Sequence, residues 1–294
     1  MTATPAKPTT DCEPMDLDLV KVTTHVLTTT RSHDPGATLI ERQRRRGSTW
    51  TLVDHGRGLA RTAELLYQVY RSDRPAACLL LLAGHERSGE TPDKVRIRDW
   101  VPAHISVLSP GQLSPGGTPL PHVPRARAYR VGSEQAIIWS PDDDVVIAGD
   151  LLAPDLPDLS HISPRQAMDG LHYAASQGPL VTIGSHGNVI DARPQVAAGT
   201  YVPPHKLATV ADMRTRIAYI QDIATVAYAG VRQELTPRRA ACQGWEHLSH
   251  WTGRDQEQQV QLNRRHLVNL HSAMAAVRGE TVDLAAAHAD AATL

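Results

Sequence analysis

The stretches VVIAGD (145–150) and VTIGSHG (181–187) carry most of the information about the fold of this chain. Each is a short run of β-branched and small apolar residues, which is the composition of a buried strand. Each also ends in a side chain that can bind a metal ion. Similar apolar stretches upstream are ended or followed by further histidines. The sequence therefore predicts one site built from four side chains at strand ends: His85, His122, Asp150 and His186.

The segments around these stretches predict two sheets, each followed by a helix. The first series has strand-like segments at 20–30, 37–43, 48–54 and 76–84, with helical spacing at 59–72. The second series has strand-like segments at 105–108, 127–131, 136–140, 145–150 and 181–185, with a turn at 141–144 and a helix at 163–177. The order predicts an α/β fold of four layers, an αββα sandwich of two sheets with helices outside.

The C-terminal part of the chain has a different pattern. Two long segments with helical spacing end at Gly230 and Gly279, and glycine is the usual residue just past a helix. We expect the last dozen residues to fray. The predicted organisation is a disordered segment at 1–18, a sandwich domain at 19–205 and a helical region at 206–294. The apolar faces of the C-terminal helices can be buried within one chain or across a homodimer.

The composition excludes several classes of function. The 294 residues are 41% apolar and carry a net charge of −1, so there is no basic excess for binding nucleic acid. The three cysteines are widely spaced, which suits a reducing compartment and excludes a cysteine-based zinc motif. No apolar run reaches about 18 residues, and the N-terminus lacks a signal-peptide pattern. We expect a cytoplasmic protein that acts on a small molecule and binds neither nucleic acid nor a membrane.

This order of motifs resembles the metallo-β-lactamase fold superfamily. The resemblance covers residues 20–205 and is carried by Asp-His-Gly at 54–56, AGD at 148–150 and SHG at 185–187. The C-terminal helices, with NRRHLVNL at 263–270, are similar to the helical tail of hydrolases resembling β-lactamase-like protein 2. The resemblance implies the αββα fold and a metal site whose ligands are His85, His122, Asp150 and His186.

One loop departs from the family pattern. Members carry H-x-H-x-D-H there, which presents ligands to two adjacent ions. The matching stretch is AGHERS at 83–88, in which only His85 occupies a ligand position, and Arg87 and Ser88 replace Asp and His. The resemblance therefore implies a mononuclear site, with Arg87 and Ser88 beside the substrate. The ligand set suits zinc, iron or manganese, of which zinc is the preferred ion, and His186 is either the fourth ligand or a hydrogen-bond donor to the substrate. Asp54 is expected to orient a loop or a ligand through hydrogen bonds rather than to bind the ion.

These residues favour a metal-dependent hydrolase of an ester, thioester or lactone. In this interpretation the ion activates a water molecule, Asp150 orients that water and takes its proton, and Arg87 or the ion stabilises the oxyanion. A role in a specialised biosynthetic pathway fits a chain that has lost part of the general site. The alternative is a metal-free or non-hydrolytic member, a cyclase, lyase or ligand-binding protein, that uses Arg87 for an anionic ligand.

Two other interpretations of these residues compete with a metal site. A single histidine in a loop is more often a polar surface residue, so only the joint order of the four residues supports a site. The stretch GRGLAR at 56–61 resembles a dinucleotide-binding fingerprint, but Arg61 replaces its third glycine. A metal site at the strand ends therefore explains more of the sequence than a nucleotide site does.

Overall fold

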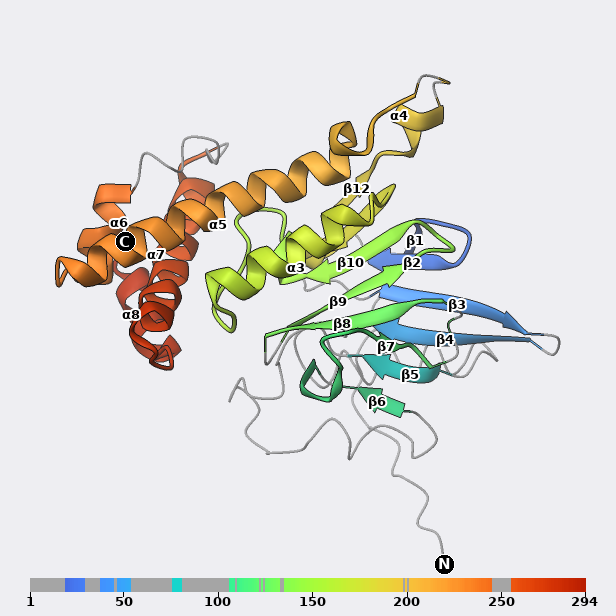
Figure 1. The fold of residues 1–294 in the computed structure, drawn as a ribbon, viewed down its shortest axis with the longest axis horizontal. Coiled ribbons are helices and arrows are strands. Elements are labelled where there is room, and N and C mark those ends of the chain that lie inside the picture. The colour runs from blue at the N-terminus through green and yellow to red at the C-terminus, as the bar shows by residue number, and fades with distance from the viewer. Residues whose placement is uncertain are drawn as a thin grey trace, which may run out of the picture.

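In the part of the chain that the computed structural model describes, two six-stranded sheets pack face to face, and helices lie over the outer face of the second sheet (Figure 1). The predicted α/β class with a helical C-terminal section is confirmed in the described part of the chain. The helix expected at 59–72 lies outside that part. The structure describes residues 19–29, 38–44, 47–53, 76–80, 106–108, 110–121, 123, 125–132, 135–197, 199, 201–244 and 255–294.

The first sheet is mixed. Its first three strand pairings are antiparallel, and its last two are parallel. In order across the sheet, the strands are β1 (Leu19–Lys21), β2 (Val26–Thr29), β3 (Thr38–Arg44), β4 (Gly47–Val53), β5 (Ala76–Leu80) and β6 (Ser106–Leu108).

The single strand expected at 20–30 is instead the hairpin of β1 and β2. The chain turns back between them, and the backbone N–H groups of Val22 and Thr23 donate to the carbonyl of Val26 at 2.8 and 3.1 Å. The Thr23 hydroxyl accepts hydrogen bonds from the N–H groups of His25 and Val26. It therefore provides the acceptor that these backbone donors of the turn need. A threonine at this position can therefore end a run of β-branched residues that otherwise predicts one continuous strand.

The second sheet contains the predicted site strands at its centre. Its order is β12 (Val189–Asp191), β11 (Val181–Gly184), β10 (Val145–Gly149), β9 (Gln135–Ser140), β8 (Arg127–Val131) and β7 (Thr118–Pro119). Every residue of β10 is buried. Val145 and Ile147 face the core between the sheets, whereas Val146 and Ala148 belong to the core beneath the helices. A strand covered on both faces has no polar alternation, which explains its uniformly apolar sequence.

Helices cover the outer face of the second sheet and extend beyond it (Figure 1). The N-terminus of α3 is fixed as the sequence predicts, because Ser163 and Gln166 form a reciprocal capping box and Pro164 begins the helix. The helices are α3 (Pro164–Ser176), α4 (Arg193–Ala197), α5 (Ala208–Arg232), α6 (Pro237–Gly244), α7 (Gln256–Arg278) and α8 (Leu284–Ala292), with 3-10 helices η2 (Pro110–Gln112), η3 (Asp150–Leu152), η4 (Ser185–Gly187) and η5 (Pro204–Lys206).

The predicted end of α5 is corrected, whereas the predicted end of α7 is confirmed. Helix α5 does not end at Gly230 but continues to Arg232. A Cβ atom at Gly230 would lie 2.9 Å from the Cβ of Ala240, so this glycine permits close packing of α5 against α6. Gly279, in contrast, ends α7 in the left-handed conformation with φ 73°, as predicted.

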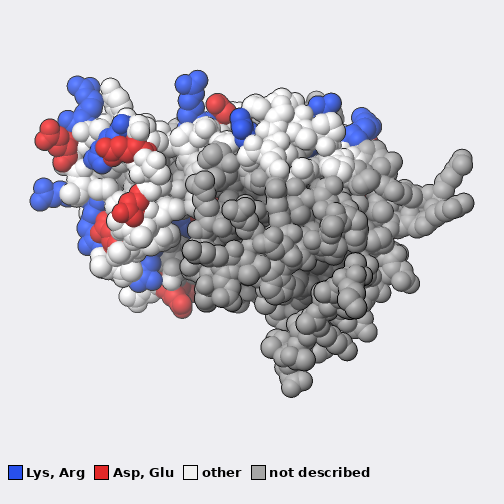
Figure 2. Space-filling model, turned by 90° about the horizontal axis from the view of Figure 1, so that it is seen from below, with Lys and Arg blue, Asp and Glu red and all other residues white. Residues whose placement is uncertain are grey.

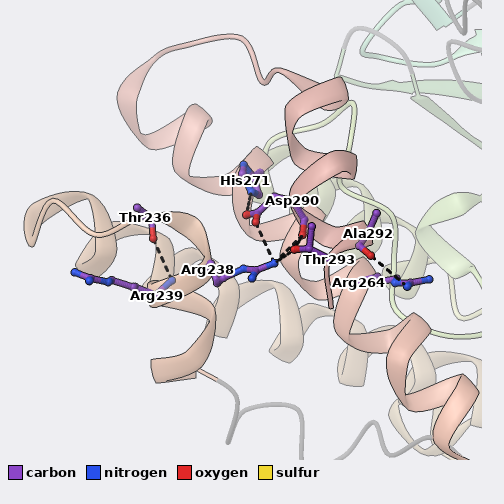
Figure 3. A network of polar contacts seen from close by, with 8 residues as sticks. All are labelled: Thr236, Arg238, Arg239, Arg264, His271, Asp290, Ala292 and Thr293. Atoms are coloured by element: carbon purple, nitrogen blue, oxygen red, sulfur yellow. Dashed lines mark hydrogen bonds and ion pairs between the residues drawn. The ribbon is translucent and has the colours of Figure 1, made fainter.

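The last dozen residues do not fray, because they form α8, which is joined to α6 and α7 by ion pairs and hydrogen bonds (Figure 3). The Asp290 carboxylate pairs with Arg238 and with His271, at 3.2 and 3.0 Å. Arg264 donates to the carbonyl of Ala292 at 3.5 Å. Acidic and basic side chains are interspersed over the visible face of this helical section (Figure 2). None of the described helices combines the length and the apolar composition needed to cross a bilayer.

Candidate metal and catalytic site

Asp150 and His186 lie on contacting turns at one edge of the second sheet. Strands β10 and β11 pair in parallel, with Gly149 opposite Gly184. The residues that follow form η3, which begins with Asp150, and η4, which contains His186. These two 3-10 helices contact each other. Parallel pairing therefore places one carboxylate-bearing and one imidazole-bearing residue at neighbouring strand ends.

The remaining predicted site residues lie outside the described part of the chain. Their positions and the complete ligand set therefore stay predictions. Within the described residues, no group of three or more His, Cys, Asp or Glu side chains is placed to hold a metal ion. A complete ligand set would need His85 and His122, which lie outside the described residues. The residues concerned are Asp54, His85, Arg87, Ser88 and His122.

The backbone of His186 is in the left-handed region, at φ 56° and ψ 31°. Such a conformation costs a residue with a side chain about 1–2 kcal/mol relative to the right-handed one. Residues held this way are concentrated at functional sites, where the surrounding structure imposes the conformation. Gly187 follows at φ 69°, so two successive left-handed residues turn the chain sharply after β11.

Asn188 imposes this turn and joins it to η3. Its carbonyl accepts from the N–H of Gly184 at 2.7 Å, and its own N–H donates to the carbonyl of Ser185 at 3.2 Å. Its side-chain amide donates to the carbonyl of Leu152 at 2.8 Å. This role of Asn188 is not among the predictions from the sequence, although an asparagine that follows a His-Gly pair is a recognisable turn signal.

Position 184 requires a glycine because the backbone of Leu152 lies very close to it, and not because of the backbone angles of Gly184. Its φ is −102°, which any residue can adopt. A Cβ atom there would lie 1.7 Å from the carbonyl oxygen of Leu152, far inside van der Waals contact. The absence of a side chain at Gly184 therefore lets η3 lie directly against the end of β11.

Ser185, between Gly184 and His186, carries a buried hydroxyl. The residue is 3% exposed, and its Oγ atom has no hydrogen-bond partner among the described residues. A buried hydroxyl without a partner costs about 1–3 kcal/mol. An unsatisfied polar atom next to His186 is a group that a bound ligand can pair with.

The segment that follows Asp150, residues 151–163, has no regular structure after η3 and is held by side chains of the helices. Arg216 of α5, only 2% exposed, donates to the carbonyl of Asp155 at 3.1 Å. Asn269 of α7 donates to the carbonyl of Pro157 at 2.7 Å and accepts from the N–H of Leu159 at 2.9 Å. These bonds satisfy backbone groups that would otherwise be buried without partners.

Asp158 lies at the centre of this segment. Its backbone N–H donates to the carbonyl of Asp150 at 3.0 Å, and its carboxylate accepts from the N–H of Ser160 at 2.9 Å and pairs with Arg265 of α7. Burial alone would raise the pKa of Asp158, but the charge of Arg265 and the bonds from Ser160 outweigh burial and lower it. The negative charges of Asp158 and of Asp150 both act to raise the pKa of Arg265 against the effect of its burial.

A buried polar cluster continues from Asn269 into the helical section. The side-chain amide of Asn269 donates to the hydroxyl of Tyr219 at 3.1 Å, and that hydroxyl lies 3.2 Å from Nδ1 of His266. Burial raises the pKa of Tyr219, which is therefore a neutral hydrogen-bonding group. NRRHLVNL was predicted as part of a helical tail, but the contacts of Arg265 and Asn269 with the residues beyond Asp150 were not predicted.

Solved structures with a similar arrangement are β-lactamase-type proteins. A β-lactamase domain protein from Burkholderia ambifaria is 15% identical, with coverage of 92% of this chain and 91% of that chain and a TM-score of 0.49. The metallo-β-lactamase FIM-1 from Pseudomonas aeruginosa, in its mono-zinc form, is 14% identical over 63% of this chain and 96% of that chain, with a TM-score of 0.42. A metallo-β-lactamase from Hirschia baltica is 13% identical over 67% and 97%, with a TM-score of 0.45.

No protein-family model and no curated protein matches the chain. The two facing sheets and the helical C-terminal section agree with the metallo-β-lactamase-like fold that the motifs predict. A likeness at such low identity concerns the fold, so the activity of this chain has to be inferred from its own residues.

We predict that Gly184→Ala lowers the free energy of unfolding by about 3 kcal/mol or more, because the new methyl group displaces the Leu152 carbonyl. Gly116→Ala is the matched control, since its Cβ would meet only the Ser114 hydroxyl at 3.7 Å. The control should change the free energy by no more than about 0.5 kcal/mol. Urea unfolding of both variants measures this, and equal effects would contradict the close approach.

We predict that His186→Gly raises the free energy of unfolding by about 0.5–1 kcal/mol, because glycine adopts the left-handed conformation without strain. Glu234→Gly is the control, since Glu234 has φ 55° in the turn after α5. Both variants should gain stability, as measured by thermal and urea unfolding. A loss confined to His186→Gly would mean that the contacts of the imidazole outweigh the backbone strain.

We predict that the Asp158 ion pair contributes to stability at neutral pH and is lost in acid. Because folding lowers the pKa of Asp158, its contribution is complete above its ordinary pKa of 3.8 and disappears as the pH falls through the lower folded value. Asp158→Asn should cost about 2 kcal/mol at pH 7 and progressively less below about pH 4. Asp169→Asn, at a position 73% exposed, should cost little at either pH in urea unfolding. A cost of Asp158→Asn that does not vary with pH would contradict the ion pair.

Proposed function

We propose that the chain is a metal-dependent hydrolase of a small acyl substrate, with one divalent ion bound at the ends of β10 and β11. The proposed ligands are His85, His122, Asp150 and His186. One observation carries the proposal: Asp150 and His186 stand on contacting turns at adjacent parallel strand ends, and His186 is held in a strained conformation. Strain of this kind is retained where a side chain has a functional position.

The donor chemistry of the described residues fits zinc. A carboxylate and an imidazole are both common zinc ligands, and two more histidines would complete a four-coordinate site. The buried hydroxyl of Ser185 beside His186 is a further polar group that a bound water molecule or substrate oxygen could pair with. When bound, the ion would supply a water molecule activated for attack near neutral pH.

The chain's own residues have separate roles in this proposal. The Asp150 carboxylate orients the attacking water molecule and accepts its proton. The Arg87 guanidinium donates to the oxygen of the acyl group as negative charge develops there, and Ser88 contacts the substrate. Asp54 orients a ligand or loop through hydrogen bonds. The proposed substrates are esters, thioesters or lactones, in a cytoplasmic and specialised biosynthetic setting.

The second candidate is a metal-free or non-hydrolytic protein, either a cyclase or lyase or a binding protein for an anionic ligand. Arg87 favours it, because this residue places a fixed positive charge where the family pattern has an aspartate. In both candidates the substrate or ligand is a small molecule. A homodimer through the C-terminal helices is compatible with either.

We predict that protein purified without chelator contains about one zinc ion per chain and that His122→Ala contains much less. Hydrolysis of generic thioesters or lactones should disappear with chelator and return with zinc. His288→Ala, at an exposed position on α8, is the control and should keep both metal and activity. Absence of metal from the unmodified protein, together with anion-dependent thermal stabilisation that chelator does not change, would favour the second candidate instead.

A further inference from the structure

One face of α7 holds the segment after Asp150. Arg265 and Asn269 are four residues apart and therefore lie on the same side of the helix. Asn269 bonds the segment on both sides of Asp158, at the carbonyl of Pro157 and at the N–H of Leu159. Arg265 pairs with the carboxylate of Asp158 itself. Three consecutive residues of an irregular loop are thus fixed by two side chains of one helix.

Asp158 connects this helix face to Asp150. Its backbone N–H donates to the carbonyl of Asp150, whereas its carboxylate is held by Arg265 and by Ser160. Both ends of Asp158 are therefore fixed, one on the proposed ligand residue and the other on the helix. The carboxylate of Asp158 is 15% exposed and the side chain of Arg265 34%, so water screens their attraction only in part.

We propose that Arg265 and Asn269 are positioning residues of the site, which fix the orientation of Asp150 through Asp158. The inference rests on the proposed function, because it assigns these residues a role in metal binding. It makes the helical C-terminal section a part of the site rather than a separate support. Residues that orient a metal ligand without touching the ion commonly alter metal affinity when they are replaced.

A second link between Arg265 and the ligand is electrostatic. The charge of Asp150 acts on Arg265 in addition to the charge of Asp158. The charges of two carboxylates therefore act on the guanidinium, that of Asp158, with which it pairs directly, and that of Asp150. Replacing Arg265 with a neutral residue removes both the hydrogen bond that fixes Asp158 and a positive charge near Asp150.

The decisive experiment compares Arg265→Gln with Arg264→Gln. Arg264 is its neighbour on α7, but it donates to the carbonyl of Ala292 at the end of α8 (Figure 3). Zinc affinity of the metal-free proteins is measured by competition with a chromophoric chelator. Arg265→Gln should bind zinc about tenfold more weakly or worse, and Arg264→Gln should bind as the unmodified protein does.

Hydrogen exchange of the metal-free proteins provides a readout that is independent of zinc. The amide of Asp158 should exchange faster in Arg265→Gln than in Arg264→Gln, with amides in β9 as an internal reference for global stability. If Arg265→Gln does not fold, Arg265→Lys replaces it; it keeps the charge but loses the planar fork, and it should show the same two changes to a smaller extent.

The outcomes separate the two proposals. Unchanged zinc affinity and unchanged exchange in the Arg265 variants would overturn the positioning role. Absence of zinc binding by the unmodified protein would contradict the proposed function. In that case the exchange of Asp158 still decides whether α7 holds the segment, and equal exchange in both variants would overturn the inference by itself.

Discussion

The parallel pairing of β10 with β11 is the constraint on which the rest of the candidate site depends. It aligns Gly149 with Gly184, so the next residues of both strands leave the sheet at the same edge. The approach of Leu152 to Gly184 then leaves no space for a side chain between η3 and β11. Because interiors are close-packed, this contact fixes the separation of the two turns more strictly than a hydrogen bond alone could.

The backbone groups beyond Asp150 need hydrogen-bond partners, and side chains of the C-terminal helices supply them for several of these groups. An irregular buried segment has N–H and C=O groups that no sheet or helix satisfies. Here Arg216 of α5 and Asn269 of α7 supply the missing partners, and Arg265 neutralises the carboxylate at its centre. These bonds allow the segment to leave regular structure next to a candidate ligand, because they pair backbone groups on both sides of Asp158. Stability of the helical section and geometry of the site are consequently coupled.

The sequence predicted local features well and long-range side-chain contacts poorly. Strands β10 and β11 and the capping box of α3 follow from the composition and spacing of adjacent residues. The turn between β1 and β2 is stabilised by the hydroxyl of Thr23, and the β-propensity of the residues does not indicate this turn. The contact of Asn269 with Pro157 joins residues separated by 112 positions. Nothing in local periodicity indicates such a contact, because it depends on how α7 packs.

The same reasoning explains why the strained and unsatisfied groups of the site persist. The left-handed backbone of His186 opposes folding by about 1–2 kcal/mol, and the Ser185 hydroxyl, which has no partner among the described residues, opposes it by about 1–3 kcal/mol. Both lie at the end of β11, which is buried along its whole length and pairs on one side with the fully buried β10. Burial of these strands stabilises the fold by more than the two unfavourable groups destabilise it, since one fully buried valine or isoleucine contributes about 1.5–3 kcal/mol. Burial of the two strands can thus offset both the left-handed backbone of His186 and the buried hydroxyl of Ser185.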